Sequence, residues 1–151
     1  MAMDFQVIID NLPLYFQGLW VTILLVVTSL ILGLCLALPI ALLAASKNRW
    51  VSIVPKAYIY FFRGTPLLVQ MFMIYHGMGQ FEAVHESFLW VIFKQAYACA
   101  LLAFALNTAA YTAEILRGTI EQTAFGEIEA AKACGMSNAM IYRRIILPST
   151  F

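Results

Sequence analysis

Long uncharged stretches alternate with short charged segments along the chain. A helix needs about 20 mostly apolar residues to cross the roughly 30 Å of hydrocarbon in a bilayer. Uncharged residues run from 11 to 46, from 64 to 81 and from 95 to 113. The second run is short for a crossing, so its helix is extended backward to include basic residues near one end. The pattern predicts an all-α, polytopic membrane protein with spans at about 19–45, 57–79 and 95–115.

The placement of basic residues predicts the orientation of these spans. The connection over residues 47–63 carries four basic and no acidic side chains, whereas residues 80–94 carry two acidic side chains and one lysine. Because loops rich in lysine and arginine stay in the cytoplasm, we expect the first connection to be cytoplasmic and the second to lie outside. The N-terminus then lies outside, and the chain beyond the third span is cytoplasmic.

Composition supports a membrane protein and excludes several other classes. Hydrophobic residues make up 63% of the chain and charged residues 11%, whereas soluble domains carry roughly 25% charged residues. The net charge of +1 is too small for the electrostatic surface that nucleic acids require. We therefore expect lipid as the surrounding medium and no nucleic acid as a partner.

Catalysis and metal binding are also not expected of this chain. Its three cysteines lack the paired spacing of a zinc site or of a secreted disulfide framework. His76 and His85 have no obvious third ligand. No G-x4-G-K-[ST] loop is present to hold nucleotide phosphates. We expect no metal, no cofactor and no enzymatic activity.

The polar segment after the third span predicts a helical hairpin. Glu127 and Glu129 suit the first turn of a helix, where carboxylates favour the positive end of the helix dipole. Gly135 suits a left-handed helix end, Ser137 can cap the next helix, and Pro148 can stop it. We expect a helix, a glycine turn and a second helix within residues 118–148.

This hairpin carries a recognisable signature. The pattern EAA-x3-G-x9-I-x-LP is complete, and it resembles the EAA loop of importer-type ABC transporter permeases, whose transmembrane domain has the MetI-like fold. The resemblance implies a cytoplasmic segment over residues 116–148 that couples to a separate ATP-binding subunit. A solvated hairpin without a partner remains the alternative. The residues of the signature are Glu129, Ala130, Ala131, Gly135, Ile145, Leu147 and Pro148.

Two further segments narrow the resemblance. Residues 62–70 (FRGTPLLVQ) and 106–115 (LNTAAYTAEI) resemble signatures of the polar amino-acid uptake branch. Within it the chain is most similar to the M-type subunit of histidine/lysine/arginine/ornithine and opine importers. The resemblance implies a bacterial inner-membrane permease for polar, basic amino acids of the arginine, ornithine or histidine type. Glutamine or an opine as substrate, a non-transporting scaffold or assembly protein, and a secondary transporter remain as alternatives.

The family also implies partners. They are a homodimer of the ATP-binding subunit at the cytoplasmic face, a companion permease subunit and a periplasmic amino-acid-binding protein, with ATP hydrolysis in the partner. Family members continue through further spans after the EAA loop, whereas this sequence stops at Phe151. We therefore expect it to be an N-terminal portion of a permease.

Polar residues within the predicted spans are candidates for a translocation pathway. Ionisable groups at membrane depth cost a few kcal/mol, ~2.5–3.5 on insertion scales. Arg63 and Thr65 precede Pro66, which breaks or kinks a helix, and broken helices line cavities in transporters. The helical spacing i, i+4, i+7 places three more candidates on one face. Alternatively, the arginine snorkels to headgroups, the carboxylate lies at the interface and the amide bonds a neighbouring helix. The candidates are Arg63, Thr65, Asn107, Tyr111 and Glu114.

Overall fold

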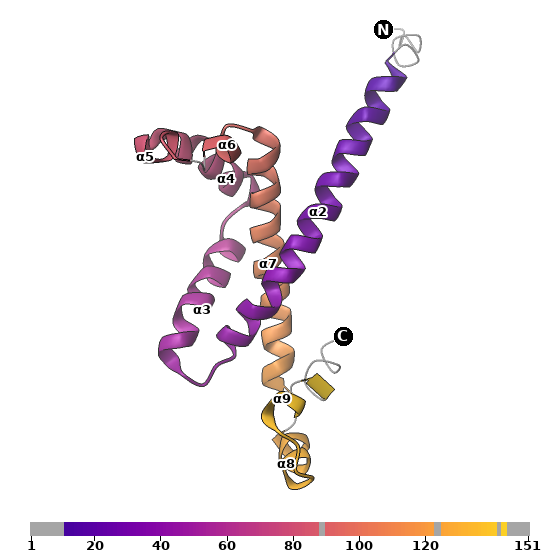
Figure 1. The fold of residues 1–151 in the computed structure, drawn as a ribbon, viewed down its shortest axis with the longest axis vertical. Coiled ribbons are helices and arrows are strands. Elements are labelled where there is room, and N and C mark those ends of the chain that lie inside the picture. Colours follow the sequence, from indigo (N-terminus) through magenta and orange to yellow (C-terminus); the bar gives the residue numbers. More distant parts are fainter. Residues whose placement is uncertain (1–10, 88–89, 123–124, 142, 145–151) are drawn as a thin grey trace.

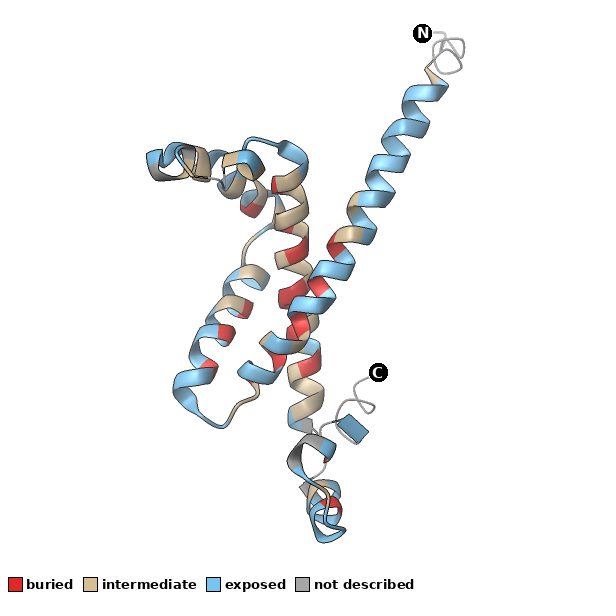
Figure 2. Cartoon of the chain, in the orientation of Figure 1, coloured by how far each residue is buried: buried red, intermediate tan, exposed pale blue. Residues whose placement is uncertain are grey.

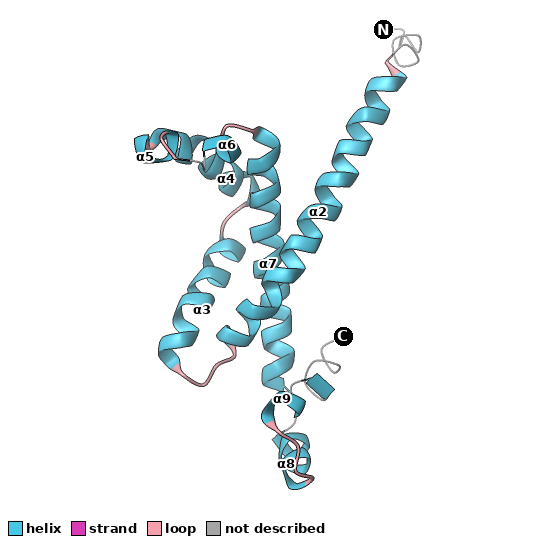
Figure 3. Ribbon diagram, viewed as in Figure 1, coloured by secondary structure: helices cyan, strands magenta, loops and turns pink. Residues whose placement is uncertain are grey.

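The computed structural model describes residues 11–87, 90–122, 125–141 and 143–144. The described residues form helices joined by short turns and include no strand, so the all-α prediction is confirmed (Figure 3). In chain order the helices are α2 (Leu12–Ala44), α3 (Arg49–Gly64), α4 (Leu67–Phe72), the π-helix η1 (Met73–Gly77), the 3-10 helix η2 (Met78–Gln80), α5 (Glu82–His85), α6 (Trp90–Phe93), α7 (Ala96–Gln122), α8 (Phe125–Ala133) and α9 (Asn138–Ile141).

Two of the described helices, α2 and α7, are long and apolar enough to cross a bilayer. A proline in the first turn starts α2, where its missing N–H group costs nothing. The 33 residues of α2 correspond to about 50 Å at 1.5 Å per residue, which exceeds the roughly 30 Å hydrocarbon layer. The helices predicted at 19–45 and 95–115 are thus present, and each is longer than predicted.

The helix predicted over residues 57–79 is interrupted at Pro66, where the sequence predicts a break or kink. Helix α3 begins at Arg49 and ends at Gly64, and Thr65 is extended (φ −112°, ψ 141°) before α4 begins at Leu67. Pro66 causes the interruption, because it has no N–H group and holds the preceding residue in an extended conformation. The break at this proline was anticipated, and the segment's passage across the membrane stays a prediction.

Small residues let α2 and α7 pack closely. Gly33, Ala37 and Ala41 follow one another at four-residue steps on α2, and all three are buried. A Cβ atom added to Gly33 would lie 2.8 Å from the side chain of Thr108, so the two backbones meet more closely than any larger residue would permit. Such small-residue contacts are typical of helix pairs in lipid, where van der Waals packing stabilises the pair. In Figure 2 many of the buried residues gather where α2 and α7 cross, and others lie along α3.

Helix α3 packs against the same pair and completes the bundle. Ile59 joins the buried cluster that includes Ala41 and Ala113. The hydroxyl of Tyr58 donates a hydrogen bond of 2.6 Å to the carbonyl oxygen of Leu106 in α7. This bond fixes α3 against the middle of α7.

The arrangement places chain segments at two opposite ends (Figure 1). The turn over residues 45–48 and the hairpin formed by α8 and α9 lie at one end, whereas the start of α2 and helices α5 and α6 lie toward the other. This is the arrangement that the predicted orientation requires. Which end faces the cytoplasm stays a prediction.

Candidate functional site

The turn between α8 and α9 is a Schellman motif centred on Gly135. The N–H group of Gly135 donates to the carbonyl oxygen of Lys132 at 2.9 Å, and that of Met136 donates to Ala131 at 3.1 Å. Gly135 has φ +77°, a conformation that costs other residues about 1–2 kcal/mol. The glycine cap predicted from the sequence is confirmed, and its geometry follows from the local backbone.

The second helix of the hairpin begins at a serine cap, also as predicted. The N–H group of Met140 donates to Ser137 Oγ at 3.4 Å, and that of Ile141 donates to the Ser137 carbonyl oxygen at 3.0 Å. The three signature residues at the end of the hairpin lie outside the described residues, and with them the predicted stop. They are Ile145, Leu147 and Pro148.

A small apolar cluster joins the two helices of the hairpin to the end of α7. Ala131 and Ile141 are 6% and 2% exposed, and Ile120, Ile128 and Met136 pack around them. Met136, the residue after Gly135, packs against this cluster, as an apolar residue at that position of a Schellman turn often does. The hairpin is therefore a folded unit held by its caps and by this cluster.

The two alanines of the signature differ in exposure, because only one of them belongs to this cluster. Both alanines belong to the signature, and both are small enough to let the backbone of a partner approach. Ala131 is instead buried inside the hairpin, whereas Glu129 and Ala130 are exposed. The reason is helical geometry, because adjacent residues of a helix point in directions about 100° apart. A partner can thus reach Glu129 and Ala130 but not Ala131.

The second group of candidates lies where α3 and α4 meet α7. Without an N–H group at Pro66, the carbonyl oxygen of Phe62 loses its helical partner. The side-chain amide of Gln70 lies 2.8 Å from this oxygen, and that of Asn107 lies 3.4 Å from it. The Gln70 amide also lies 2.7 Å from Thr65 Oγ1 and 3.0 Å from the Thr65 carbonyl oxygen. The amide of Asn107 donates further to Gln70 Oε1 at 3.2 Å.

These hydrogen bonds assign Asn107 and Thr65 to the broken corner. The sequence alternative for Asn107, a hydrogen bond to a neighbouring helix, is what the structure contains. Gln70 is 3% exposed and supplies most of the bonds, yet sequence reasoning did not select it. Its position in the sequence could have indicated this role, because Gln70 lies four residues after Pro66 and thus one turn into the next helix, near the break.

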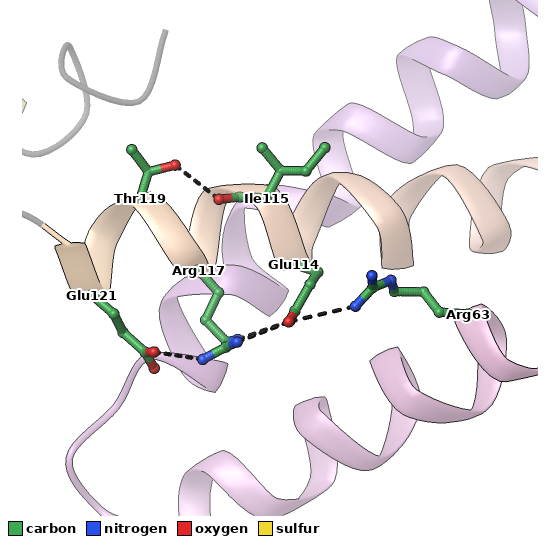
Figure 4. A network of polar contacts seen from close by, with 6 residues as sticks. All are labelled: Arg63, Glu114, Ile115, Arg117, Thr119 and Glu121. Atoms are coloured by element: carbon green, nitrogen blue, oxygen red, sulfur yellow. Dashed lines mark hydrogen bonds and ion pairs between the residues drawn. The ribbon is translucent and has the colours of Figure 1, made fainter.

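The charged candidates form a chain of contacts about two turns further along α7 (Figure 4). Arg117 holds both carboxylate oxygens of Glu114 at 2.8 Å and contacts Glu121 at 2.6 Å. Arg63 reaches across from α3 and lies 3.5 Å from Glu114. Its guanidinium carbon lies 5.5 Å from the centre of the Tyr111 ring. Three of the predicted candidates therefore meet: Arg63, Tyr111 and Glu114.

Sequence reasoning missed Arg117, although its spacing to Glu114 and Glu121 is that of helical ion pairs. Arg117 donates two parallel hydrogen bonds to the Glu114 carboxylate, a geometry that holds this carboxylate in one orientation. Arg63 keeps 43% of its side chain exposed. Of the two arginines in this cluster, Arg63 is therefore the one whose guanidinium can bind a further anionic group.

An open cleft of about 330 Å³ lies over this cluster. Its walls come from α3 and α7, and they carry three cationic side chains and one carboxylate. This arrangement favours a negatively charged group such as the α-carboxylate of an amino acid. Among the described residues, no three potential metal-binding side chains lie together. The cleft is lined by Lys56, Ile59, Tyr60, Arg63, Glu114 and Arg117.

Comparison with known proteins connects this geometry to a family. Residues 37–151 match the family described as "binding-protein-dependent transport system inner membrane component". The chain is 48% identical over 147 residues to the nopaline transport system permease protein NocM of Agrobacterium fabrum. It is 43% identical over 135 residues to the histidine/lysine/arginine/ornithine transport system permease protein HisM of Escherichia coli K12.

A solved structure agrees in fold and sequence. The crystal structure of an amino acid ABC transporter with histidines superimposes with a TM-score of 0.81 at 35% identity, over 99% of this chain and 66% of that one. The aligned regions cover 97% of this chain and 61% of NocM, and 89% of this chain and 57% of HisM. The chain thus spans about three fifths of the length of these relatives.

Proposed function

Because the chain belongs to the binding-protein-dependent transport system inner membrane components and has their MetI-like transmembrane fold, we propose that it forms part of the membrane permease of an ATP-driven importer. The family consists of permease subunits, which are not themselves enzymes. ATP hydrolysis belongs to a partner in this proposal. The chain transmits the resulting movement to the membrane helices.

One observation carries the proposal: the hairpin presents Glu129 and Ala130 on an ordered surface at the end of α7. Glycine and serine caps fix its shape, and Ile120 links it to α7. A displacement of the hairpin would therefore move α7. A charged acceptor beside a small residue suits a close, hydrogen-bonded contact with another protein.

The proposed partners follow from this role. They are two copies of an ATP-binding subunit at the hairpin, a companion permease subunit and a periplasmic amino-acid-binding protein.

The proposal also includes an orientation. The chain lies in a bacterial inner membrane, with its N-terminus in the periplasm and the hairpin in the cytoplasm. The four basic residues between 47 and 63 support that orientation.

The proposed substrates are polar amino acids, in particular basic ones of the arginine, ornithine or histidine type. The printed names of the relatives include nopaline and octopine transport as well as histidine, lysine, arginine and ornithine transport, so an opine is an alternative within the same proposal. In the cleft, Arg63 would meet the substrate carboxylate, with Tyr111 and Glu114 beside it. Thr65 and Asn107 would shape the broken corner that borders the pathway.

The decisive experiment reverses one charge on the hairpin. In the full-length protein, Glu129→Arg is expected to lower co-purification with the ATP-binding subunit and permease-stimulated ATPase activity by about tenfold or more, because an interfacial charge pair becomes repulsive. Glu127→Arg is the matched control, because Glu127 is also exposed and lies on the same helix. It is expected to leave both measurements near their original values.

Other outcomes would favour the alternatives. A complex that survives Glu129→Arg unchanged would contradict the coupling role. A membrane protein that binds no ATPase would be a scaffold. Uptake driven by a proton or sodium gradient without ATPase activity would indicate a secondary transporter.

A further inference from the structure

The first half of α3 has a face that no other described part of the chain covers. Ser52, Pro55 and Ile59 are buried, and Ile59 belongs to the cluster shared with α2 and α7. Trp50 and Val54, in contrast, are 85% and 72% exposed. An indole with this exposure is unusual on a surface in contact with water alone.

Trp50 is nevertheless held in place. Its backbone N–H group donates to the side-chain oxygen of Asn48 at 3.1 Å, which caps the start of α3. Four residues, 45–48, separate the end of α2 from the start of α3. Trp50 therefore lies in the first turn of α3, directly after the short connection that leaves the long apolar helix α2.

The same turn is basic and has no acidic side chain near it in the sequence. Lys47 and Arg49 are exposed, and the sequence has no aspartate or glutamate between residues 11 and 81. None of the ion pairs among the described residues involves either of them. An open cleft of about 370 Å³ lies between Arg49, Trp50 and Ile53.

We propose that the elbow surface, formed by Lys47, Arg49, Trp50, Ile53 and Val54, rests on anionic phospholipid headgroups at the edge of the bilayer that α2 crosses. Indole rings favour the headgroup layer because they combine an apolar body with an N–H donor. Lysine and arginine beside the membrane are attracted to anionic lipid. The apolar side chains between them enter the outer part of the acyl region, as in interfacial helices.

This assignment depends on α2 crossing a membrane and not on transport. The charge complementarity and the position at the end of α2 favour a lipid surface over a protein partner. It also gives α3 a fixed depth in the bilayer, and α3 supplies Arg63 to the charged cluster. Failure of the proposed import function would leave this inference intact.

The test measures which lipid lies next to Trp50. A full-length variant in which Trp50 is the one tryptophan, with phenylalanine at the other tryptophan positions, is reconstituted in mixed phosphatidylglycerol and phosphatidylcholine vesicles. In one sample the phosphatidylglycerol is brominated near its headgroup, and in the other the phosphatidylcholine is. Brominated phosphatidylglycerol is expected to quench Trp50 fluorescence several-fold more at equal mole fraction, and 1 M salt should reduce this preference.

The double variant K47Q/R49Q is expected to remove this several-fold preference, so that the two brominated lipids quench Trp50 about equally, since each basic residue contributes to the attraction. The variant R143Q/R144Q is the matched control, because it also removes two exposed cations from the chain and should retain the preference. Native mass spectrometry of the protein with its original tryptophans gives a second measure of retained lipid. Equal quenching by both lipids, or protection of Trp50 from iodide only when a partner subunit is added, would overturn the proposal.

Discussion

Gly33 and Gly135 occupy two regions that depend on glycine for different reasons. Gly33 has an ordinary helical backbone, but a Cβ atom there would lie 2.8 Å from Thr108 on another helix. Gly135 has nothing within 4 Å of such an atom, but its φ is +77°. The first glycine is required by a neighbour that lies 75 positions away in the sequence, and the second by its own backbone.

The difference teaches how the two regions are built. The α2–α7 contact is a close approach of two long apolar helices, stabilised by packing over many residues. The hairpin has a cluster of only a few side chains and relies on its caps. Its small core leaves Glu129 and Ala130 exposed.

The largest effect is expected at the helix crossing. Gly33→Leu inserts four carbon atoms where one is already too close, and it should destabilise the protein by about 3 kcal/mol, near the upper end for overpacking. Gly18→Leu is the matched control on the same helix, because Gly18 has open space around it. Thermal unfolding of the full-length proteins in detergent measures both. Equal destabilisation by the two variants would contradict the close contact.

A smaller, local effect is expected at the hairpin. Gly135→Ala should cost about 1–2 kcal/mol from the left-handed backbone alone, so amide exchange in the hairpin should accelerate by roughly tenfold. The unfolding of the α2–α7 pair should not change. Gly126→Ala, within α8 and at an ordinary φ, should leave exchange equal or slower. Hydrogen exchange of the two variants measures the difference, and equal acceleration would show that the turn geometry is not the cause.

The smallest effect on stability is expected at the charged joint between α3 and α7. Glu114→Gln should cost less than about 1 kcal/mol, because the cluster is partly exposed and such pairs contribute little. It should, however, raise the apparent KM for arginine uptake by the assembled transporter while leaving that for a neutral amino acid unchanged. Glu121→Gln is the matched control, because it also removes a partner of Arg117. It should alter neither of the two KM values. Unchanged arginine uptake in Glu114→Gln would exclude Glu114 from the pathway.

Features that depend on the local chain were predictable from the sequence. The long helices follow from apolar runs, the break at Pro66 from a missing N–H group, and the caps at Gly135 and Ser137 from backbone and side-chain geometry within a few residues. The predicted ends of the long helices were less accurate. A charged residue ends an apolar run, but it does not end a helix, and α7 therefore continues past Glu114 to Gln122.

Features that depend on distant residues were decided by the tertiary structure. Gln70 hydrogen-bonds to Asn107 across 37 positions, Ala131 is buried in one cluster with Ile141, and Thr108 limits the space at Gly33. The sequence by itself determined which segments become helices, where they break and which turn carries the EAA signature, since hydropathy and backbone preference act over a few residues. Only the folded chain decided which polar groups meet, because hydrogen bonds and close packing require atoms to lie within a few ångströms of one another, wherever they stand in the sequence.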